Sequence, residues 1–127
     1  MSKNFKLERA KTDVTPYILI DEEKGYMKFE GESYHENVVS FYSEINKWLG
    51  EFLQTDFESF TFDCELRYFS SSTVKLLLNM LQDMDSSHNC KKITVNWITT
   101  ESNMIIRECG EDFQEDLENI TFNLVVK

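Results

Sequence analysis

The sequence predicts a single α/β domain, in which a mixed β-sheet carries its helices mainly on one face. Three observations support this class. Strand-like and helix-like segments alternate in the order β-β-α-β-α-β-α-β, which is typical of strands joined by helical crossovers. The 127 residues suit one domain with a buried core. A hydrophobic content of 41%, with ten Phe, five Tyr and two Trp, indicates a packed interior rather than disorder.

Residues 15–127 form the predicted domain, and residues 1–14 are treated as an N-terminal arm. The arm has basic residues but neither an apolar core nor a small-residue cleavage site, so we do not interpret it as a secretory signal. No apolar run approaches the roughly 18 residues of a membrane span. We therefore expect a cytoplasmic protein that does not insert into membranes.

The first part of the domain is predicted to be a hairpin followed by a helix. The extended run 17–20, the turn-forming residues 21–25 and the alternating residues 26–30 are typical of two antiparallel strands. Asn37 is predicted to cap the helix, because apolar side chains follow it at helical spacing. These side chains are Val38, Phe41, Ile45, Trp48, Leu49 and Phe52.

Residues 60–69 alternate between apolar and polar side chains and predict a strand with one face inward. The expected inward residues are Phe60, Phe62, Cys64, Leu66 and Tyr68. The next helix is predicted to begin near Ser71 and to end within residues 86–89. Its apolar residues at i, i+3 and i+4 spacing are Val74, Leu77, Leu78, Leu81 and Met84.

The last three predicted elements are a strand, a helix and a strand. Residues 91–98 are typical of a strand, and residues 120–126 alternate as the final strand. Residues 104–113 are predicted as a helix, although Gly110 interrupts its pattern. The elements thus fill the chain without a linker or an internal repeat.

Charge and cysteine content restrict the class of partner. The formal net charge of −10 opposes binding to nucleic acid and to anionic lipid, so other proteins are the expected partners. Cys64, Cys90 and Cys109 are widely spaced and form no C-x-x-C motif, and His35 and His88 do not stand at metal-ligand spacing from them. We expect free thiols in a reducing compartment, with neither a metal nor another cofactor.

Four consecutive hydroxyl residues, Ser70 to Thr73, separate the predicted strand from the predicted helix. Capping of a helix start explains Ser70 well, but it does not explain the other three, because Ser and Thr are mediocre inside helices. A phosphoryl group on Ser71 would lie at the free amides and the positive end of the helix dipole. It would also add nearly two negative charges to a docking surface. Reversible phosphorylation therefore fits this run best.

Catalysis by a serine of this run is disfavoured. The sequence has no G-x-S-x-G motif, and a general base would have to be His35 or His88. His88 follows the far end of the same predicted helix, roughly 25 Å away at 1.5 Å per residue. None of the four glycines lies in the hydroxyl run, so a nucleotide-phosphate loop is also disfavoured. We expect a protein that is not an enzyme.

Four stretches of the chain resemble the SiaC family of bacterial regulatory phosphoproteins, a STAS-like group. They are Thr15-Pro16 with the strand and acidic turn that follow, Gly31-Glu32-Ser33-Tyr34-His35-Glu36-Asn37 with Trp48 in the next helix, residues 68–75, and Met104 with Glu108-x-Gly110-Glu111-Asp112-Phe113. They occur in the family's order and extend over nearly the whole chain. Ser70 replaces the family's Asn, Ser71 stands where Thr is common, and His35 replaces Pro.

The resemblance implies a STAS-like fold and a role in partner switching. Family members are phosphorylated on the hydroxyl residue after the Asn position by a serine/threonine protein kinase, and a PP2C-type phosphatase removes the phosphate. In this sequence that residue is Ser71, with Ser70, Ser72 and Thr73 as alternates. The unphosphorylated protein is expected to bind and regulate a diguanylate cyclase, in cyclic di-GMP signalling and biofilm regulation.

Neighbouring residues are the expected partner contacts, namely Tyr68, Phe69, Ser70, Ser72 and Lys75. One of the two aromatic residues is expected in the core and the other as an exposed anchor, since aromatic residues are favoured at interface hot spots. Lys75 lies one helical turn after Ser71, where it either contacts a phosphate or a partner carboxylate or is simply solvated.

Two alternative functions stay open from the sequence. An anti-sigma-factor antagonist of the STAS type would share the fold and the phosphorylation but would bind an anti-sigma kinase. A small-ligand-binding or enzymatic domain would instead use the region of Cys64 and Cys90 or the acidic cluster of Glu108, Glu111 and Asp112. Its activity would not depend on Ser71.

Overall fold

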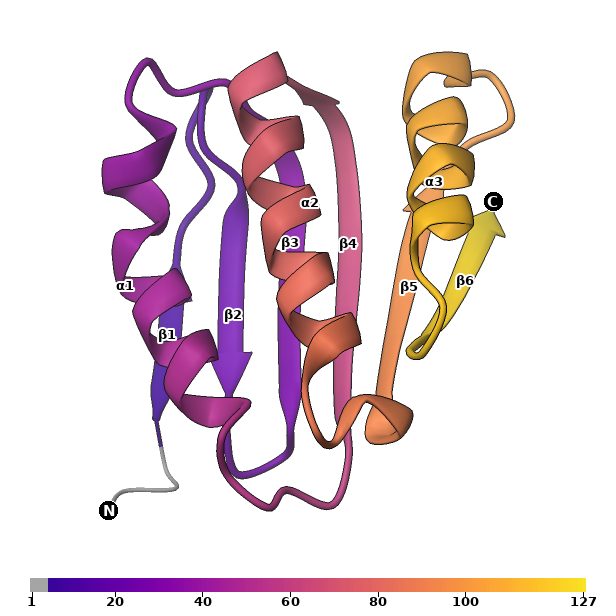
Figure 1. Ribbon diagram of the computed structural model, residues 1–127. Helices are drawn as coiled ribbons and strands as arrows, with labels where there is room; N and C mark the ends of the chain where they lie inside the picture. Colours follow the sequence, from indigo (N-terminus) through magenta and orange to yellow (C-terminus); the bar gives the residue numbers. More distant parts are fainter. Residues whose placement is uncertain (1–4) are drawn as a thin grey trace.

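A computed structural model describes residues 5–127 as a six-stranded sheet with three helices on one face (Figure 1). The strands are β1 (Lys6–Arg9), β2 (Tyr17–Asp21), β3 (Tyr26–Ser33), β4 (Phe60–Phe69), β5 (Ile93–Thr99) and β6 (Thr121–Val126). The helices are α1 (Val38–Phe52), α2 (Ser71–Ser86) and α3 (Met104–Asp116), with a 3₁₀ turn, η1 (Cys90–Lys92), before β5. The mixed sheet and its one-sided helical layer confirm the predicted α/β class.

The strands lie side by side in sequence order, from β1 to β6. β1, β2 and β3 pair antiparallel, whereas β3, β4, β5 and β6 pair parallel. Each parallel step is bridged by a helix, and crossovers of one hand place all three helices on the same face. The predicted order holds from β2 onward. The sheet also includes β1, which lies within residues 1–14.

Alternate residues of the strands point toward the helices and form the core. Trp97, Tyr42, Phe29, Phe60 and Phe62 are the largest fully buried side chains. No helix covers the other face of the sheet within residues 5–127 (Figure 1).

Hydrogen-bonded polar side chains cross this uncovered face. The Tyr26 hydroxyl donates to Asp63 Oδ2 over 2.7 Å. Asn96 Nδ2 donates to Asp63 Oδ1 over 2.8 Å, and Asn123 Nδ2 donates to Asn96 Oδ1 over 3.0 Å. The uncovered face is thus a polar surface suited to water.

α1 has the predicted N-cap but a different set of buried residues. Asn37 Oδ1 accepts a hydrogen bond from the Ser40 amide over 3.1 Å, which confirms the cap. Phe41 is only half-buried, and its neighbour Tyr42 is fully buried, which corrects the predicted apolar face at this turn. Tyr42 can enter the core because its hydroxyl finds a polar partner there, Ser33 Oγ at 2.8 Å.

The alternation of β4 changes near its end, and this corrects the predicted position of Tyr68. Pairing with β3 passes from Gly31 opposite Leu66 to Glu32 opposite Tyr68, so Arg67 is an extra residue on β4. Such a bulge moves the residues that follow to the opposite face. Phe69 is therefore buried and Tyr68 is 55% exposed. Gly31 has φ of +128°, a conformation that favours glycine.

Gly110 does not end α3 but lets it pack closely on the sheet. A Cβ at this position would lie 2.4 Å from Trp97 Cδ1 and 2.6 Å from Trp97 Nε1. The indole nitrogen of Trp97 also donates to the Ile106 carbonyl over 2.9 Å. The glycine that weakened the helical pattern in the sequence therefore fixes the distance between α3 and β5.

Candidate functional site

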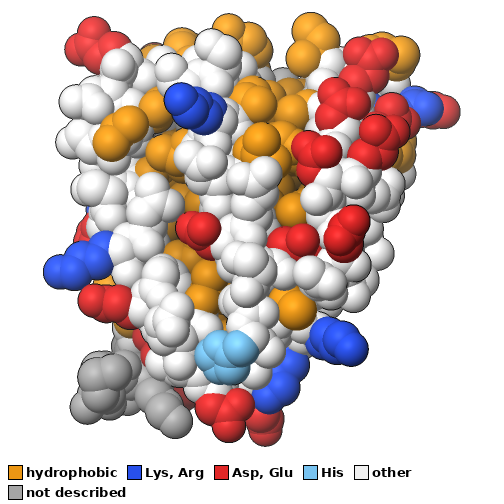
Figure 2. Space-filling view, in the orientation of Figure 1, with side chains coloured by type: hydrophobic (Ala, Val, Ile, Leu, Met, Phe, Trp, Pro, Cys, Tyr) orange, Lys and Arg blue, Asp and Glu red, His pale blue; other side chains and the backbone are white. Residues whose placement is uncertain are grey.

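All three helices begin at the same end of the molecule, where the parallel strands β3, β4 and β5 end (Figure 1). Five of the seven large hydrophobic side chains that are exposed within residues 5–127 lie at the helix starts or at the ends of the strands that lead into them. They are Tyr34, Val39, Tyr68, Met104 and Ile105. Figure 2 shows hydrophobic side chains exposed there, with carboxylates along the α3 side. Clustered exposed apolar groups typically mark an interaction surface, and we call these five residues the apical surface.

The hydroxyl run lies at the centre of this end and divides into two exposed and two engaged residues. Ser71 and Ser72, in the first turn of α2, are exposed. Ser70 is the N-cap, and its Oγ accepts from the Thr73 amide at 3.3 Å. Thr73 is fully buried. Only Ser71 and Ser72 therefore present a hydroxyl to a partner in this conformation.

A buried network of hydroxyls anchors the start of α2. Thr73 Oγ1 donates to the Ser33 carbonyl over 2.9 Å and lies 3.0 Å from Ser33 Oγ. Ser33 Oγ also meets the Tyr42 hydroxyl at 2.8 Å. The Ser70 amide donates to the Ser33 carbonyl over 3.0 Å. Ser33 thus joins β3, α1 and α2 directly beneath the exposed serines.

The two aromatic residues before the hydroxyl run have different roles. Tyr68 is exposed and packs edge-on against Tyr34, with 5.3 Å between the ring centroids. Phe69 is buried and packs edge-on against Trp97 at 5.9 Å. As expected, one of the pair is in the core and the other is at the surface. Phe69 supports the site from beneath, and Tyr68 is available to a partner.

A groove of about 610 Å³ runs between α1 and α2 and reaches the hydroxyl run. On the α2 side it is lined by Ser72, Lys75 and Leu76, and on the α1 side by Val38 and Val39. Lys75 is exposed and belongs to no ion pair of the described chain, residues 5–127. Ser72 and Lys75 therefore belong to the groove wall, whereas Ser71 does not line it.

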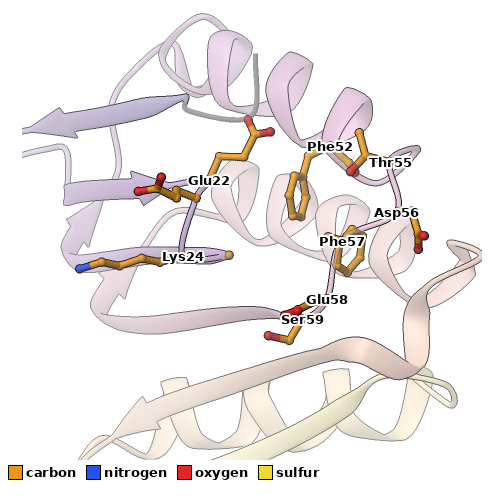
Figure 3. A pocket seen from close by; sticks show the side chains of 10 residues that line it. Glu22, Lys24, Phe52, Thr55, Asp56, Phe57, Glu58 and Ser59 are labelled. Carbon is orange, nitrogen blue, oxygen red and sulfur yellow. The ribbon is translucent and has the colours of Figure 1, made fainter. Parts of the chain in front are cut away.

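A second depression, of about 470 Å³, lies at the opposite end of the molecule (Figure 3). The β2–β3 turn and the segment between α1 and β4 form it, and its lining includes Glu22, Glu23, Asp56 and Glu58. No group of three or more His, Cys, Asp or Glu within residues 5–127 could hold a metal ion. We assign no site to this depression.

Two of the three thiols of the described chain are unsuited to nucleophilic chemistry. Burial raises the pKa of the Cys64 thiol far above its ordinary value, and burial also raises the pKa of Cys109 to about 11. Both thiols are therefore poor nucleophiles at neutral pH. His35 Nδ1 accepts the Asn37 amide over 2.9 Å, where it shapes the entry to α1.

Sequence reasoning assigned no role to Ser33 and Tyr42, nor to Val39 and Ile105 of the apical surface. Ser33 was visible only as part of the Gly-x-Ser-Tyr resemblance, and its partner Thr73 lies 40 residues away in the chain. Met104 and Ile105 carry no motif that separates an exposed apolar residue from a buried one. Their exposure follows from the fold, because α3 buries Ile106, Gly110 and Phe113 instead.

Comparison with known proteins gives consistent results. A protein of Pseudomonas aeruginosa strain UCBPP-PA14 is 26% identical over 106 residues, which cover 83% of this chain and 84% of that protein. SiaC of Pseudomonas aeruginosa has a similar fold, with a TM-score of 0.86, 23% identity and coverage of 97% of this chain and 99% of that one. A chain in the structure of the diguanylate cyclase SiaD with its activator SiaC matches with a TM-score of 0.87 and 24% identity, covering 95% and 99%.

No helix of the described chain is long and apolar enough to cross a membrane. The model of the SiaC family, whose members are described as regulatory phosphoproteins, matches residues 9–127. This match includes β2 to β6, all three helices and the whole hydroxyl run. The chain therefore belongs to the SiaC family of regulatory phosphoproteins.

Proposed function

We propose that this chain is a non-enzymatic switch protein, which is phosphorylated reversibly on Ser71 and binds a diguanylate cyclase in its unphosphorylated form. The family match supports the regulatory role, and the complex of SiaD with its activator SiaC supports the class of partner. The observation that carries the proposal is the exposed Ser71 at the N-terminus of α2, amid the apical surface. A serine/threonine protein kinase and a PP2C-type phosphatase would add and remove the phosphate in the cytoplasm.

The choice of Ser71 among the four hydroxyl residues rests on accessibility and family position. Thr73 is buried within the hydroxyl network, and Ser70 is engaged as the helix cap. Ser72 is exposed and stays the alternate, but its side chain faces the groove between α1 and α2. By the resemblance of residues 68–75, Ser71 also stands at the position that is expected to carry the phosphate.

The helix start can carry a phosphate without unfolding. The first amides of α2 have no acceptor within the helix, and they lie at the positive end of its dipole. The hydroxyl network beneath them is built from Ser33, Tyr42 and Thr73, none of which would be modified. We therefore expect phosphorylation to change the charge of the surface and to leave the fold intact.

The surface around Ser71 suits the binding of a partner protein, and a phosphate on Ser71 would oppose that binding. Tyr68, Met104 and Ile105 offer exposed apolar anchors, each more than half exposed. A phosphate would bring nearly two negative charges and a hydration shell into this setting. A partner that buries the apolar groups would have to desolvate the phosphate, which is costly without paired cations. Phosphorylation is thus expected to weaken cyclase binding.

Isothermal titration with the diguanylate cyclase of the same organism tests the proposal. The titrants are the unmodified protein, the protein with phosphoserine at position 71, and Ser71→Ala. We expect the unmodified and Ser71→Ala forms to bind equally and to raise cyclase activity. Phosphoserine should reduce the affinity by about tenfold or more, which corresponds to about 1.4 kcal/mol.

Phosphoserine at position 72 is the matched control for the register of the site. Ser71→Glu should mimic the phosphate only partly, since a carboxylate has less charge and fewer acceptors. Equal affinities of the unmodified and the phosphoserine-71 proteins would contradict the proposed switch. A loss of affinity confined to the phosphoserine-72 protein would move the switch to Ser72.

A further inference from the structure

β6 is an edge strand whose own residues lack the usual protection. It pairs only with β5 among residues 5–127, and it forms one outer edge of the sheet in Figure 1. Residues Thr121 to Val126 include no charged residue, no proline and no glycine, and Val125 and Val126 are 38% and 42% exposed. β1, at the other edge, has only four residues, and three of them are charged. Unprotected edges are templates for a further strand.

The backbone groups that β6 offers follow from its pairing with β5. The Lys127 amide donates to the Thr99 carbonyl over 2.8 Å. Since successive residues of a strand direct their backbone groups to opposite sides, Phe122, Leu124 and Val126 direct theirs away from β5. Gln114 of α3 confirms the direction, because its Nε2 donates to the Phe122 carbonyl over 3.0 Å. The free edge therefore offers the backbone of Leu124 and Val126 and the amide of Phe122.

We propose that β6 is a dimerisation edge, on which a second copy of this chain adds its own β6 antiparallel about a twofold axis at Leu124. In this register Leu124 faces Leu124 of the second copy, and Phe122 faces Val126. All of these residues direct their backbone groups outward, so these three facing pairs are hydrogen-bonded pairs. The Gln114 side chain would give up the Phe122 carbonyl to the incoming amide.

The side chains of β6 complement themselves in the same register. On the helical face, two Phe122–Val126 pairs and one Leu124–Leu124 pair would cover the exposed Val126 and the half-buried Leu124 of each copy. On the uncovered face, Asn123 faces Val125, and Thr121 faces Lys127. Cross-strand apolar pairs stabilise sheets, whereas facing like charges destabilise them. No facing pair in this arrangement joins two like charges.

The side chains nearest the edge balance in charge, both on β6 itself and on the flank of α3 that carries Gln114. Gln114 reaches the edge of β6, and Arg107 and Glu111 lie on the same flank of α3, at helical spacing from it. Arg107 and Glu111 form an ion pair of 3.9 Å. A twofold interface of one patch with itself is also the commonest arrangement of homo-oligomers.

Light scattering coupled to size exclusion, at concentrations from micromolar to millimolar, tests the dimer. The wild-type mass should rise from 15.0 kDa toward twice that value. Leu124→Pro removes one outward amide and none of the bonds to β5. This variant should stay monomeric at concentrations at least tenfold higher than those at which the wild type dimerises. Leu124→Val keeps the amide and is the matched control, with the mass of the wild type. Circular dichroism verifies that both variants fold.

A charge exchange on the uncovered face tests the register without touching the core. Asn123→Glu with Val125→Glu puts carboxylates opposite each other, and Asn123→Lys with Val125→Lys does the same with ammonium groups. Each double variant should be monomeric alone, and an equimolar mixture should form a dimer of one copy of each. A wild-type protein that stays monomeric at millimolar concentration would overturn the proposal. So would a dimer that Leu124→Pro leaves intact, or a mixture that does not associate.

Discussion

Thr73 and Ser33 are joined by two buried contacts, in which Thr73 Oγ1 donates to the Ser33 carbonyl over 2.9 Å and lies 3.0 Å from Ser33 Oγ. Both residues are almost completely buried. The pair ties the first turn of α2 to the end of β3, one residue from the exposed Ser72. The site thus combines a rigid base with hydroxyls that stay accessible, which suits a modification that changes a surface rather than a fold.

Thr73→Val should destabilise the protein by about 1–2 kcal/mol, because it removes the hydroxyl that makes these bonds and keeps the shape of the side chain. Urea denaturation measures this loss. Ser72→Ala is the matched control, and its exposed side chain predicts a change within about 0.5 kcal/mol. Equal stabilities of the two variants would show that the buried network does not hold the helix start.

Tyr68→Ala and Phe69→Ala should separate binding from stability. Phe69 is buried against Trp97, so its truncation is expected to cost about 3–5 kcal/mol of stability. Tyr68 is 55% exposed, so Tyr68→Ala should change stability by less than about 1 kcal/mol. If Tyr68 is an anchor, its loss should weaken cyclase binding by about 2 kcal/mol. Denaturation and calorimetric titration measure the two effects, and unchanged binding would remove Tyr68 from the interface.

Gly110→Ala and Gly50→Ala should have opposite effects on stability. An added Cβ at Gly110 would meet the Trp97 ring at 2.4 Å, and such overpacking costs about 1–3 kcal/mol. At Gly50, in α1, nothing lies within 4 Å of the added carbon, so the better helix propensity of Ala should add about 0.5–1 kcal/mol. Thermal unfolding compares the two variants. A stabilised Gly110→Ala would contradict the close packing of α3 on β5.

Asp85 predicts a pH dependence of stability. Partial burial alone would raise its pKa, but hydrogen bonds from the amides of Asn119, Ile120 and Glu118 outweigh burial and lower the pKa below its ordinary value. The ionised carboxylate therefore stabilises the folded state at pH values above the unfolded pKa of about 3.9. This contribution disappears as the pH falls through the lowered pKa of the folded state.

Asp85→Ala should accordingly cost about 1–3 kcal/mol at pH 7. The difference from the wild type should shrink below about pH 4. Urea denaturation over pH 2 to 7 measures it, with Asp83→Ala, at an exposed position of the same helix, as the control. A difference that does not depend on pH would mean that the carboxylate charge is not what holds the segment between α3 and β6.

Most elements of the fold could be predicted from local patterns. The alternation of residues 60–69 matches the bounds of β4, and the predicted start of α2 at Ser71 is its observed start. β1 could not be predicted, because its four residues have no pattern of their own and become a strand only by pairing with β2. The position of Tyr68 depends on the bulge at Arg67, which is defined by pairing with β3.

The site was predictable only where the chain itself brings its residues together. Tyr68 to Lys75 are contiguous, so the strand end, the cap and the exposed serine could be placed from the sequence. Ser33, Tyr42 and Ile105 come from three other elements, and only the folded sheet brings them to the same end. The burial of Thr73 could not be predicted either, because its hydrogen-bond partner Ser33 is remote in the chain.

Phosphopeptide mass spectrometry on the protein isolated from its own cells, before and after phosphatase treatment, tests the central claim most directly. We expect one phosphate that the phosphatase removes, and fragment ions that place it on Ser71. Phosphate on Thr73 would contradict the structural basis of the assignment, because that hydroxyl is buried and hydrogen-bonded. A protein that carries no phosphate under any growth condition would contradict the proposed switch itself.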